Sequence, residues 1–491
     1  MLWSEYVPPF VRRHAPTLLT YGLAVVMGVA LGVVVPKLGG ESLYRLIMAV
    51  VGILIALGMM ISGQVERMLV FFTVLTLSIT LSFSPFGDVD LHAGGASVGV
   101  LIYLYDLPLV GMILVYAGSV LLGRILLRLT AVDGVALLWI MWSFLSLANS
   151  SDLALSMAEI IRMIKLYLLG HIIASVVDDE QGVHDVVNAL LLSLLLQSAF
   201  GLGQYLFDLN LASFGFVVGD FRRISGLIGW PNTFGAYMAA VLCFPIAAWL
   251  WRGAGRLRVF APGLALIGFF PLIFSFSRGS WLGLIAGVAV IIVLGRLAMP
   301  LRQDTIIRLA LIGVLALGAV LLFYNEISVR LAQDSLTVRE QLNEVAFNMI
   351  EANLLLGVGL NTFEPVMVSY DTVGVTEYFR EPVHNVFLLI GAETGLVGLG
   401  LFLLLVGLVC WQGLQVLRRG SPYLIVMQLA VLGALIVLMV TNLFDVHLRT
   451  DTNYGLFWLL LGLTLAMRRM ASRSARVRTP PAECGPDLAA A

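Results

Sequence analysis

Long runs of apolar residues recur along this chain, and they limit its possible folds more than any other feature. Hydrophobic residues make up 60% of the 491 positions and charged residues only 12%, whereas soluble globular proteins contain about 25% charged residues. A soluble core cannot bury so much apolar surface, so we expect lipid to surround much of the chain. The sequence therefore predicts an all-α integral membrane protein, a polytopic bundle of about 12–14 transmembrane helices.

Fourteen apolar runs are candidate spans, because about 20 helical residues are needed to cross roughly 30 Å of hydrocarbon. The runs lie at 17–36, 43–62, 68–83, 107–123, 134–148, 158–177, 184–207, 229–251, 259–275, 279–295, 305–324, 384–411, 423–442 and 453–467. The predicted order is a cytoplasmic N-terminus (1–16), eleven spans (17–324), one long extracytoplasmic loop (325–383), three spans (384–467) and a disordered cytoplasmic tail (468–491).

The distribution of basic residues predicts the orientation of these spans. With fourteen spans, both ends of the chain lie on the same side, which collects eighteen arginines against nine basic residues in the opposite loops. Basic residues favour the cytoplasmic side of a membrane, so both termini are expected there. The loop at 325–383 is then expected on the extracytoplasmic side of the membrane.

That loop contains the pattern of an amphipathic helix. Apolar residues recur at Val338, Leu342, Val345, Ala346 and Met349, a spacing that puts them on one helical face. Such a helix can lie on the membrane surface or cover a cavity.

Several basic residues lie near the predicted outer ends of spans. Arg222 and Arg223 precede one span, Arg278 occupies a very short turn between two others, and Arg162 and Lys165 share one face of a helix. Guanidinium groups bind phosphate oxygens through paired, charge-assisted hydrogen bonds. The alternative is that each cation reaches a lipid phosphate or pairs with a loop carboxylate. For Arg278, held between two spans, we favour a functional role.

His384 is the main candidate for proton transfer. Pro382 suits the first position of the following helix, which would put His384 in its first turn. The positive end of the helix dipole disfavours a protonated ring there, and a neutral imidazole can act as a general base. The alternative is a polar residue at a helix end. Nine residues further, Glu393 lies inside the span, either as a functional carboxylate or as an acid that pins neighbouring helices; His447 is a weaker candidate.

Other kinds of chemistry find little support. No outer loop has the paired acids or histidines that a magnesium or manganese site would use, and three cysteines argue against a cysteine-based metal site. Neither a P-loop nor a dinucleotide fingerprint occurs, so nucleotide use is not expected. We expect no metal, no cofactor and no nucleic-acid partner.

Three stretches between about 160 and 405 together resemble the O-antigen ligase and polymerase superfamily of bacterial envelope enzymes. They are similar to that family's arginine, glycine and Pro-Asn pattern, to its Ser-Arg-Gly turn, and to its outer loop that ends at a His-Asn pair. In this chain they read Arg223-Ile-Ser-Gly with Pro231-Asn-Thr-Phe-Gly235, then Phe274-Ser-Phe-Ser-Arg-Gly-Ser-Trp281, and Gly357-Val-Gly-Leu-Asn-Thr-Phe363 with His384-Asn385 and Glu393-Thr-Gly395. The fourteen predicted spans exceed the twelve that are common in the ligases.

The resemblance implies a polytopic (GT-C-like) glycosyltransferase in the bacterial cytoplasmic membrane, with its active site facing the periplasm or exterior. Such enzymes need no metal and transfer a glycan from an undecaprenyl-diphosphate carrier to a sugar hydroxyl of the acceptor, either another glycan or lipid A-core. His384 is then expected to be the catalytic base, and the diphosphate is expected to bind Arg223, Arg278, Arg222, Arg162 and Lys165. Further substrate-binding residues are expected at Asn385, Glu393, Arg380 and Asn232.

Two other functions remain open from the residues alone. A transporter or flippase of lipid-linked oligosaccharide would also be polytopic with charges inside the membrane, but transporters often contain inverted repeats, and we find no convincing repeat. An assembly scaffold gives no reason for arginines to gather at the outer surface.

Overall fold

The computed structural model describes residues 64–83, 101–207, 223–300, 302–322 and 336–478. The predicted N-terminus at 1–16 and the predicted spans 17–36 and 43–62 lie outside the described residues, as do Arg222 and residues 479–491. Every statement below concerns the described part of the chain.

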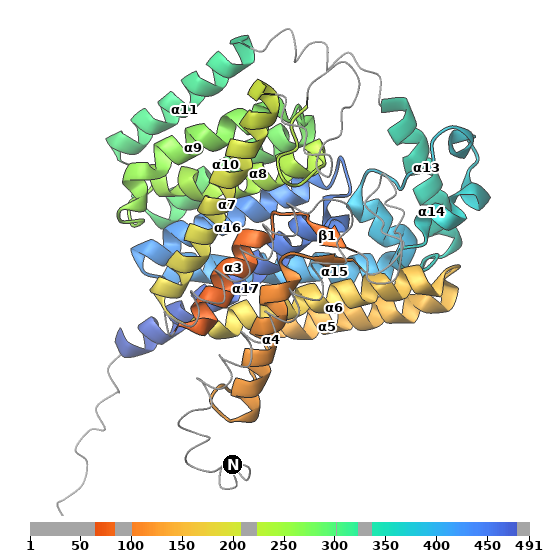
Figure 1. The fold of residues 1–491 in the computed structure, drawn as a ribbon, viewed down its shortest axis with the longest axis horizontal. Helices are drawn as coiled ribbons and strands as arrows, with labels where there is room; N and C mark the ends of the chain where they lie inside the picture. Colours follow the sequence, from red (N-terminus) through yellow and green to blue (C-terminus); the bar gives the residue numbers. More distant parts are fainter. Residues whose placement is uncertain (1–63, 84–100, 208–222, 301, 323–335, 479–491) are drawn as a thin grey trace, which may run out of the picture.

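Helices dominate the described structure (Figure 1). The long helices are α3 (Val65–Thr76), α4 (Asp106–Leu121), α5 (Ala131–Leu145), α6 (Leu153–Val176), α7 (Glu180–Phe207), α8 (Pro231–Leu250), α9 (Leu257–Phe274), α10 (Arg278–Ala298), α11 (Gln303–Leu322), α13 (Leu336–Ala352), α15 (Val386–Arg419), α16 (Pro422–Thr441) and α17 (Asp451–Arg478). Short elements are α14 (Phe363–Val366), the 3₁₀ turns η2 (Ser146–Asn149), η3 (Met367–Tyr370), η4 (Val375–Glu377) and η5 (His447–Arg449), and two antiparallel strands, β1 (Ser82–Phe83) and β2 (Ile102–Tyr103).

The structure confirms the predicted all-α, polytopic membrane class. Each of the twelve predicted runs that falls within the described residues overlaps one of the long helices. Among the described helices, seven are long and apolar enough to cross a membrane by length and composition.

Helix α8 forms the centre of one half of the bundle. It packs against α9, α10 and α16, and 94% of its apolar stretch is buried inside the protein. Helices α6, α15 and α17 form the other half, with α5 packed along α15. By contrast, α5 leaves large apolar side chains exposed, which suits contact with lipid acyl chains; these are Leu137, Leu138, Met141, Phe144 and Leu145.

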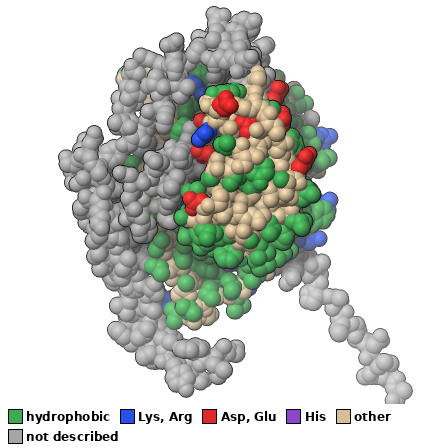
Figure 2. All heavy atoms as spheres, turned by 90° about the vertical axis from the view of Figure 1, so that its right-hand side faces the viewer, with side chains coloured by type: hydrophobic (Ala, Val, Ile, Leu, Met, Phe, Trp, Pro, Cys, Tyr) green, Lys and Arg blue, Asp and Glu red, His purple; other side chains and the backbone are tan. Residues whose placement is uncertain are grey.

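Helices α13 and α14 lie together at one end of the bundle, where α5 also passes into α6 (Figure 1). Figure 2 looks onto this end: acidic side chains are scattered over its upper part, and hydrophobic side chains gather across its lower part, where Figure 1 has α5 and α6. Helix α13 buries Leu342, Val345, Ala346 and Met349 and packs against α15. The helix thus has the amphipathic face that the sequence predicts, and it packs against protein along that face.

Helix α15 is interrupted at Gly395, whose φ of 71° lies in the left-handed region. The interruption frees backbone carbonyls that need partners inside a membrane protein. Val358 N donates to the Ala392 carbonyl at 2.8 Å and Gly359 N donates to the Glu393 carbonyl at 3.1 Å. The indole of Trp142 donates to the Thr394 carbonyl at 3.0 Å. The break in α15 therefore anchors the loop that follows α13.

Two helix boundaries differ from the prediction. Helix α15 begins at Val386, because the side chain of Asn385 caps it by accepting hydrogen bonds from the amides of Phe387 and Leu388. His384 therefore precedes the helix instead of lying in its first turn.

Helix α17 continues to Arg478, so residues 468–478 are not the disordered tail that the sequence predicted. The extension has protein contacts: Arg469 donates to the Val177 carbonyl at 2.9 Å and to the Ser175 carbonyl at 3.3 Å, both at the end of α6.

The break in α15 generates a stability prediction. In Gly395→Ala, the new Cβ would lie 2.0 Å from the Leu355 carbonyl oxygen, and a backbone with positive φ and ψ near 180° costs a non-glycine residue about 1–3 kcal/mol. We expect a lower thermal unfolding midpoint in detergent and faster proteolysis of the loop. Gly400→Ala in the same helix is the matched control, because its Cβ would meet no atom within 4 Å. Equal midpoints and cleavage rates for the two variants would contradict the assigned role of the break.

Candidate functional site

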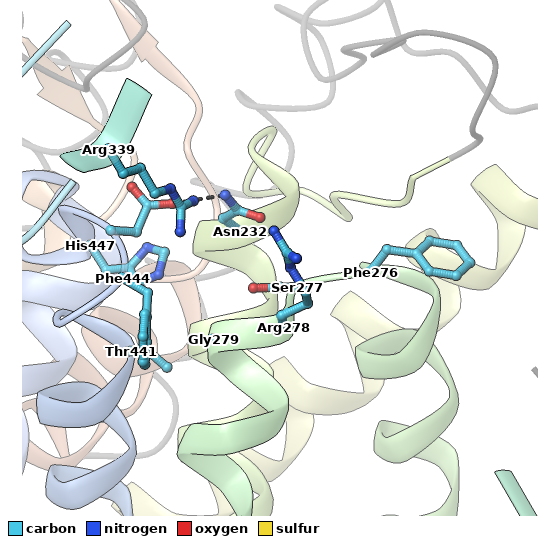
Figure 3. Close-up of a pocket in the computed structure, with 10 residues that line it drawn as sticks. Asn232, Phe276, Ser277, Arg278, Gly279, Arg339, Thr441, Phe444 and His447 are labelled. Carbon is cyan, nitrogen blue, oxygen red and sulfur yellow. Dashed lines mark hydrogen bonds between the residues drawn. The ribbon is translucent and has the colours of Figure 1, made fainter. Parts of the chain in front are cut away.

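A pocket opens at the end of the bundle that carries α13 (Figure 3). It lies where the first residues of α8 and α10 meet α13 and the turn between α16 and α17. Its lining residues are Asn232, Phe276, Ser277, Arg278, Gly279, Arg339, Thr441, Phe444, Asp445 and His447. Three separate parts of the sequence therefore supply charged side chains to one cavity.

The tight turn between α9 and α10 positions Arg278. Phe276 adopts a φ of 51°, which is rare for a residue with a side chain, and Ser277 is the N-cap residue of α10. The hydroxyls of Ser277 and Ser280 lie 2.8 Å apart and brace the turn. Arg278 is thus the first residue of α10, and in Figure 3 its guanidinium points toward Asn232, whereas Phe276 points away.

A hydrogen-bonded chain runs from Arg223 across the pocket wall. Arg223 Nε donates to the Ser275 carbonyl at 2.9 Å, and one of its terminal nitrogens donates to Asn232 Oδ1 at 2.5 Å. The amide nitrogen of Asn232 donates to Asp445 Oδ2 at 2.8 Å (Figure 3). This chain ties the segment before α8, the α9–α10 turn and the α16–α17 turn into one unit.

His384 lies between two carboxylates. Its Nδ1 is 3.6 Å from Asp445 Oδ1, and its Nε2 is 3.6 Å from Glu381 Oε2. Both separations exceed a hydrogen bond, and both carboxylates are close enough to attract the ring whenever it carries a proton. Because Asp445 also accepts from Asn232, the imidazole and Arg223 belong to the same connected site.

The two carboxyl groups beside His384 differ in their electrostatics. Burial opposes ionisation of Asp445, but His447, His384 and the backbone amide of Val446 outweigh it and hold the pKa of this carboxyl well below its ordinary value. Burial raises the pKa of Glu381, and the nearby Asp445 raises it further, although His384 acts in the opposite direction. Asp445 is therefore the ionised partner that can stabilise a positive charge on the imidazole.

Arg162 and Lys165 lie in a second, buried cluster of charges. Arg162 pairs with Glu159 at 2.5 Å and lies 3.7 Å from Asp451. Lys165 lies 3.1 Å from both Asp451 and Asp106. Each cation is matched by carboxylates within the protein, and neither lines the pocket at the α13 end. The expected gathering of these two cations with the outer arginines is not what the structure shows.

Glu393 belongs to the same buried cluster. Its carboxylate contacts the guanidinium of Arg449, which also lies 3.4 Å from Glu159. Arg449 thereby joins α15 and α6 to the turn that carries Asp445 and His447. This arrangement corresponds to the interpretation in which Glu393 pins neighbouring helices.

The remaining predicted residues have local partners. Asn385 caps α15 through its side chain. Arg380 is exposed, donates to the Thr376 carbonyl at 3.1 Å and does not line the pocket. Within the described ranges, no group of three or more His, Cys, Asp or Glu side chains could hold a metal ion.

Sequence reasoning missed two charged residues of the pocket and underestimated a third. Arg339 lies on the polar side of α13, and its side chain points into the pocket (Figure 3). Asp445 was assigned no role from the sequence, and His447 ranked as a weaker candidate. The available signal was an acid two residues from a histidine just past the end of a span, but neither residue is near His384 in sequence.

Comparison with known proteins adds one match. Residues 263–403 match the family model described as O-antigen ligase, and no curated protein matches the chain. The matched segment runs from α9 into α15 and contains Arg278, Arg339 and His384, whereas Arg223 and Asp445 lie on either side of it. The match confirms the resemblance to the O-antigen ligase and polymerase superfamily.

The buried charge cluster generates a second stability prediction. Arg449→Met would leave Glu393 buried without its cation, and breaking a buried ion pair in this way costs about 3–5 kcal/mol. We expect a large fall in the thermal midpoint in detergent, and partial recovery in the double variant Arg449→Met/Glu393→Gln, which removes the orphaned charge. A single variant as stable as the wild type, or a double variant less stable than the single one, would refute this role for the pair.

Proposed function

We propose that this protein is a glycosyltransferase of the O-antigen ligase or polymerase type. It would move a glycan from an undecaprenyl-diphosphate carrier to an acceptor sugar hydroxyl, without a metal, at the outer face of the bacterial cytoplasmic membrane. One observation carries the proposal: Arg223, Arg278 and the His384–Asp445 pair form one connected site at a single end of the helix bundle. The O-antigen ligase match over the central part of this site supports it.

The arginines suit the leaving group of this reaction. A lipid diphosphate departs with two or three negative charges, and its departure is easier where fixed cations face the phosphate oxygens. Arg278 lines the pocket directly, and Arg223 lies behind Asn232 in its wall. Arg339 adds a guanidinium from α13 and offsets the carboxylate of Asp445, so the pocket stays attractive to an anion.

The imidazole suits activation of the acceptor. His384 would accept the proton of the acceptor hydroxyl while the hydroxyl oxygen attacks the anomeric carbon of the donor sugar. The bond from that carbon to the diphosphate oxygen breaks, and the leaving diphosphate keeps the electron pair. Asp445 would act as a positioning residue that stabilises the imidazolium formed in this step.

The position of the pocket suits an amphipathic donor. Its charged residues come from the start of α10, from α13 and from the turn after α16, so a diphosphate could bind at the membrane boundary while the isoprenoid chain stays in lipid. The excess of basic residues at the other side of the spans supports an extracytoplasmic position for this end.

The main test is transfer in lipid vesicles from a carrier-diphosphate glycan to an acceptor, with a chelator present. We expect loss of about 10²–10⁴-fold in His384→Ala, which removes the base, and of about 10²–10³-fold in Arg278→Ala, which removes a charge-stabilising donor. Matched controls are His184→Ala and Arg256→Ala. His184 stacks on Tyr423 at the opposite end of the bundle, and Arg256 is an exposed residue just after α8.

Two outcomes of this experiment would contradict the proposal. Movement of the lipid-linked glycan across the bilayer without any transfer would favour a flippase. An equal loss of transfer activity in the site variants and in their controls would contradict the roles assigned to His384 and Arg278.

The pairing of His384 with Asp445 predicts a change in pH dependence. Asp445 keeps its charge because its pKa is held low, and this charge favours the imidazolium. In Asp445→Asn the acid limb of the pH–rate profile should therefore move to lower pH. The maximal rate should fall at least about tenfold, since two opposite charges about 4 Å apart attract by roughly 1–4 kcal/mol between bulk water and a protein surface. A lower rate with an unshifted acid limb would mean that Asp445 acts only on the fold.

A further inference from the structure

Four arginines converge on one carboxylate at the end of the bundle opposite the pocket. Asp304 lies 2.7 Å from Arg258, 3.3 Å from Arg252, 3.7 Å from Arg308 and 3.8 Å from Arg302. These residues come from the connection after α8, the first turn of α9, the residue just before α11 and the first two turns of α11. We call this group the Asp304 cluster.

The charges of the Asp304 cluster do not balance. Among the residues that the structure describes, one carboxylate pairs with these four guanidinium groups, which leaves an excess of three positive charges in a small volume. Like charges about 4 Å apart repel by roughly 1 kcal/mol in water and more near a protein surface. The arrangement therefore favours binding of an additional anion. Arg252 and Arg302 are the more exposed members, with side chains 57% and 56% accessible to solvent.

Apolar surface lies directly beside the Asp304 cluster. Val259 and Phe260 follow Arg258 on α9 and are 74% and 67% exposed, and Ile306 and Ile307 precede Arg308 on α11 and are 53% and 54% exposed. A small inorganic anion has no apolar part that could pack against these side chains. A ligand with a phosphate head and hydrocarbon tails would contact both surfaces at once.

We propose that the Asp304 cluster binds the headgroup of an anionic phospholipid, with the acyl chains lying against α9 and α11. The phosphate would accept hydrogen bonds from Arg252 and Arg302, while Arg258 and Arg308 stay with Asp304. Helix α8 spans about 30 Å at 1.5 Å per residue, so this site and the pocket lie at opposite ends of the bundle. The positive-inside pattern assigns the lipid site to the cytoplasmic leaflet.

The test measures lipid binding to the purified protein with phosphatidylglycerol and with phosphatidylcholine, in detergent or nanodiscs. We expect the wild type to prefer phosphatidylglycerol and the double variant Arg252→Gln/Arg302→Gln to bind it roughly tenfold or more weakly, since each basic residue near a membrane surface contributes about 1 kcal/mol. The matched control is Arg418→Gln/Arg419→Gln, which removes two exposed arginines from the end of α15.

Three results would overturn the proposal. The first is an unchanged lipid preference in Arg252→Gln/Arg302→Gln, and the second is an equal loss in the control variant, which would indicate general surface charge. The third is full competition by soluble glycerol phosphate or inorganic phosphate at the concentration of lipid, which would mean that the acyl chains add nothing. Unfolding midpoints in phosphatidylcholine alone check that each variant is folded.

Discussion

The interruption of α15 at Gly395 fixes how the loop after α13 is held at the end of the bundle that carries the pocket. A broken helix inside a membrane protein leaves carbonyl groups that must find donors, and here the loop amides of Val358 and Gly359 supply them. The loop is thereby held against α15, and α13 packs against the same helix. The same stretch of α15 presents Glu393 to Arg449, which holds the turn that carries Asp445 and His447. One backbone constraint thus positions both the cover and one wall of the pocket.

The proposed reaction needs a base and a cationic site that act on the same donor sugar. In this protein they are physically connected, because Asn232 bonds to Arg223 with its oxygen and to Asp445 with its nitrogen. A displacement of the arginine would therefore disturb the carboxylate beside His384. At the other end, guanidinium groups surround Asp304 without a matching number of acids. The same chemistry, arginine toward phosphate, accounts for the proposed donor site and for the proposed lipid site.

The buried charge cluster illustrates how similar residues acquire different roles. Arg162 and Lys165 were grouped with the outer arginines because all of them are cations near the predicted outer surface. In the folded chain they face Glu159, Asp451 and Asp106, so they neutralise acids inside the protein. Buried cations are stable only with such partners. Glu159 lies one helical turn before Arg162 on α6 itself, whereas Asp106 and Asp451 come from α4 and α17, and no local sequence pattern pairs those two helices with α6.

The sequence by itself determined the membrane class, the helices that overlap the twelve described runs, the amphipathic face of α13 and the turn that carries Arg278. These features follow from hydropathy and periodicity, which act over neighbouring residues. The tertiary structure alone decided that Asp445 lies beside His384, that Arg339 enters the pocket and that Arg449 holds Glu393. These contacts join residues about 55 to more than 100 positions apart, and their choice depends on how helices pack and on which buried charges must be compensated.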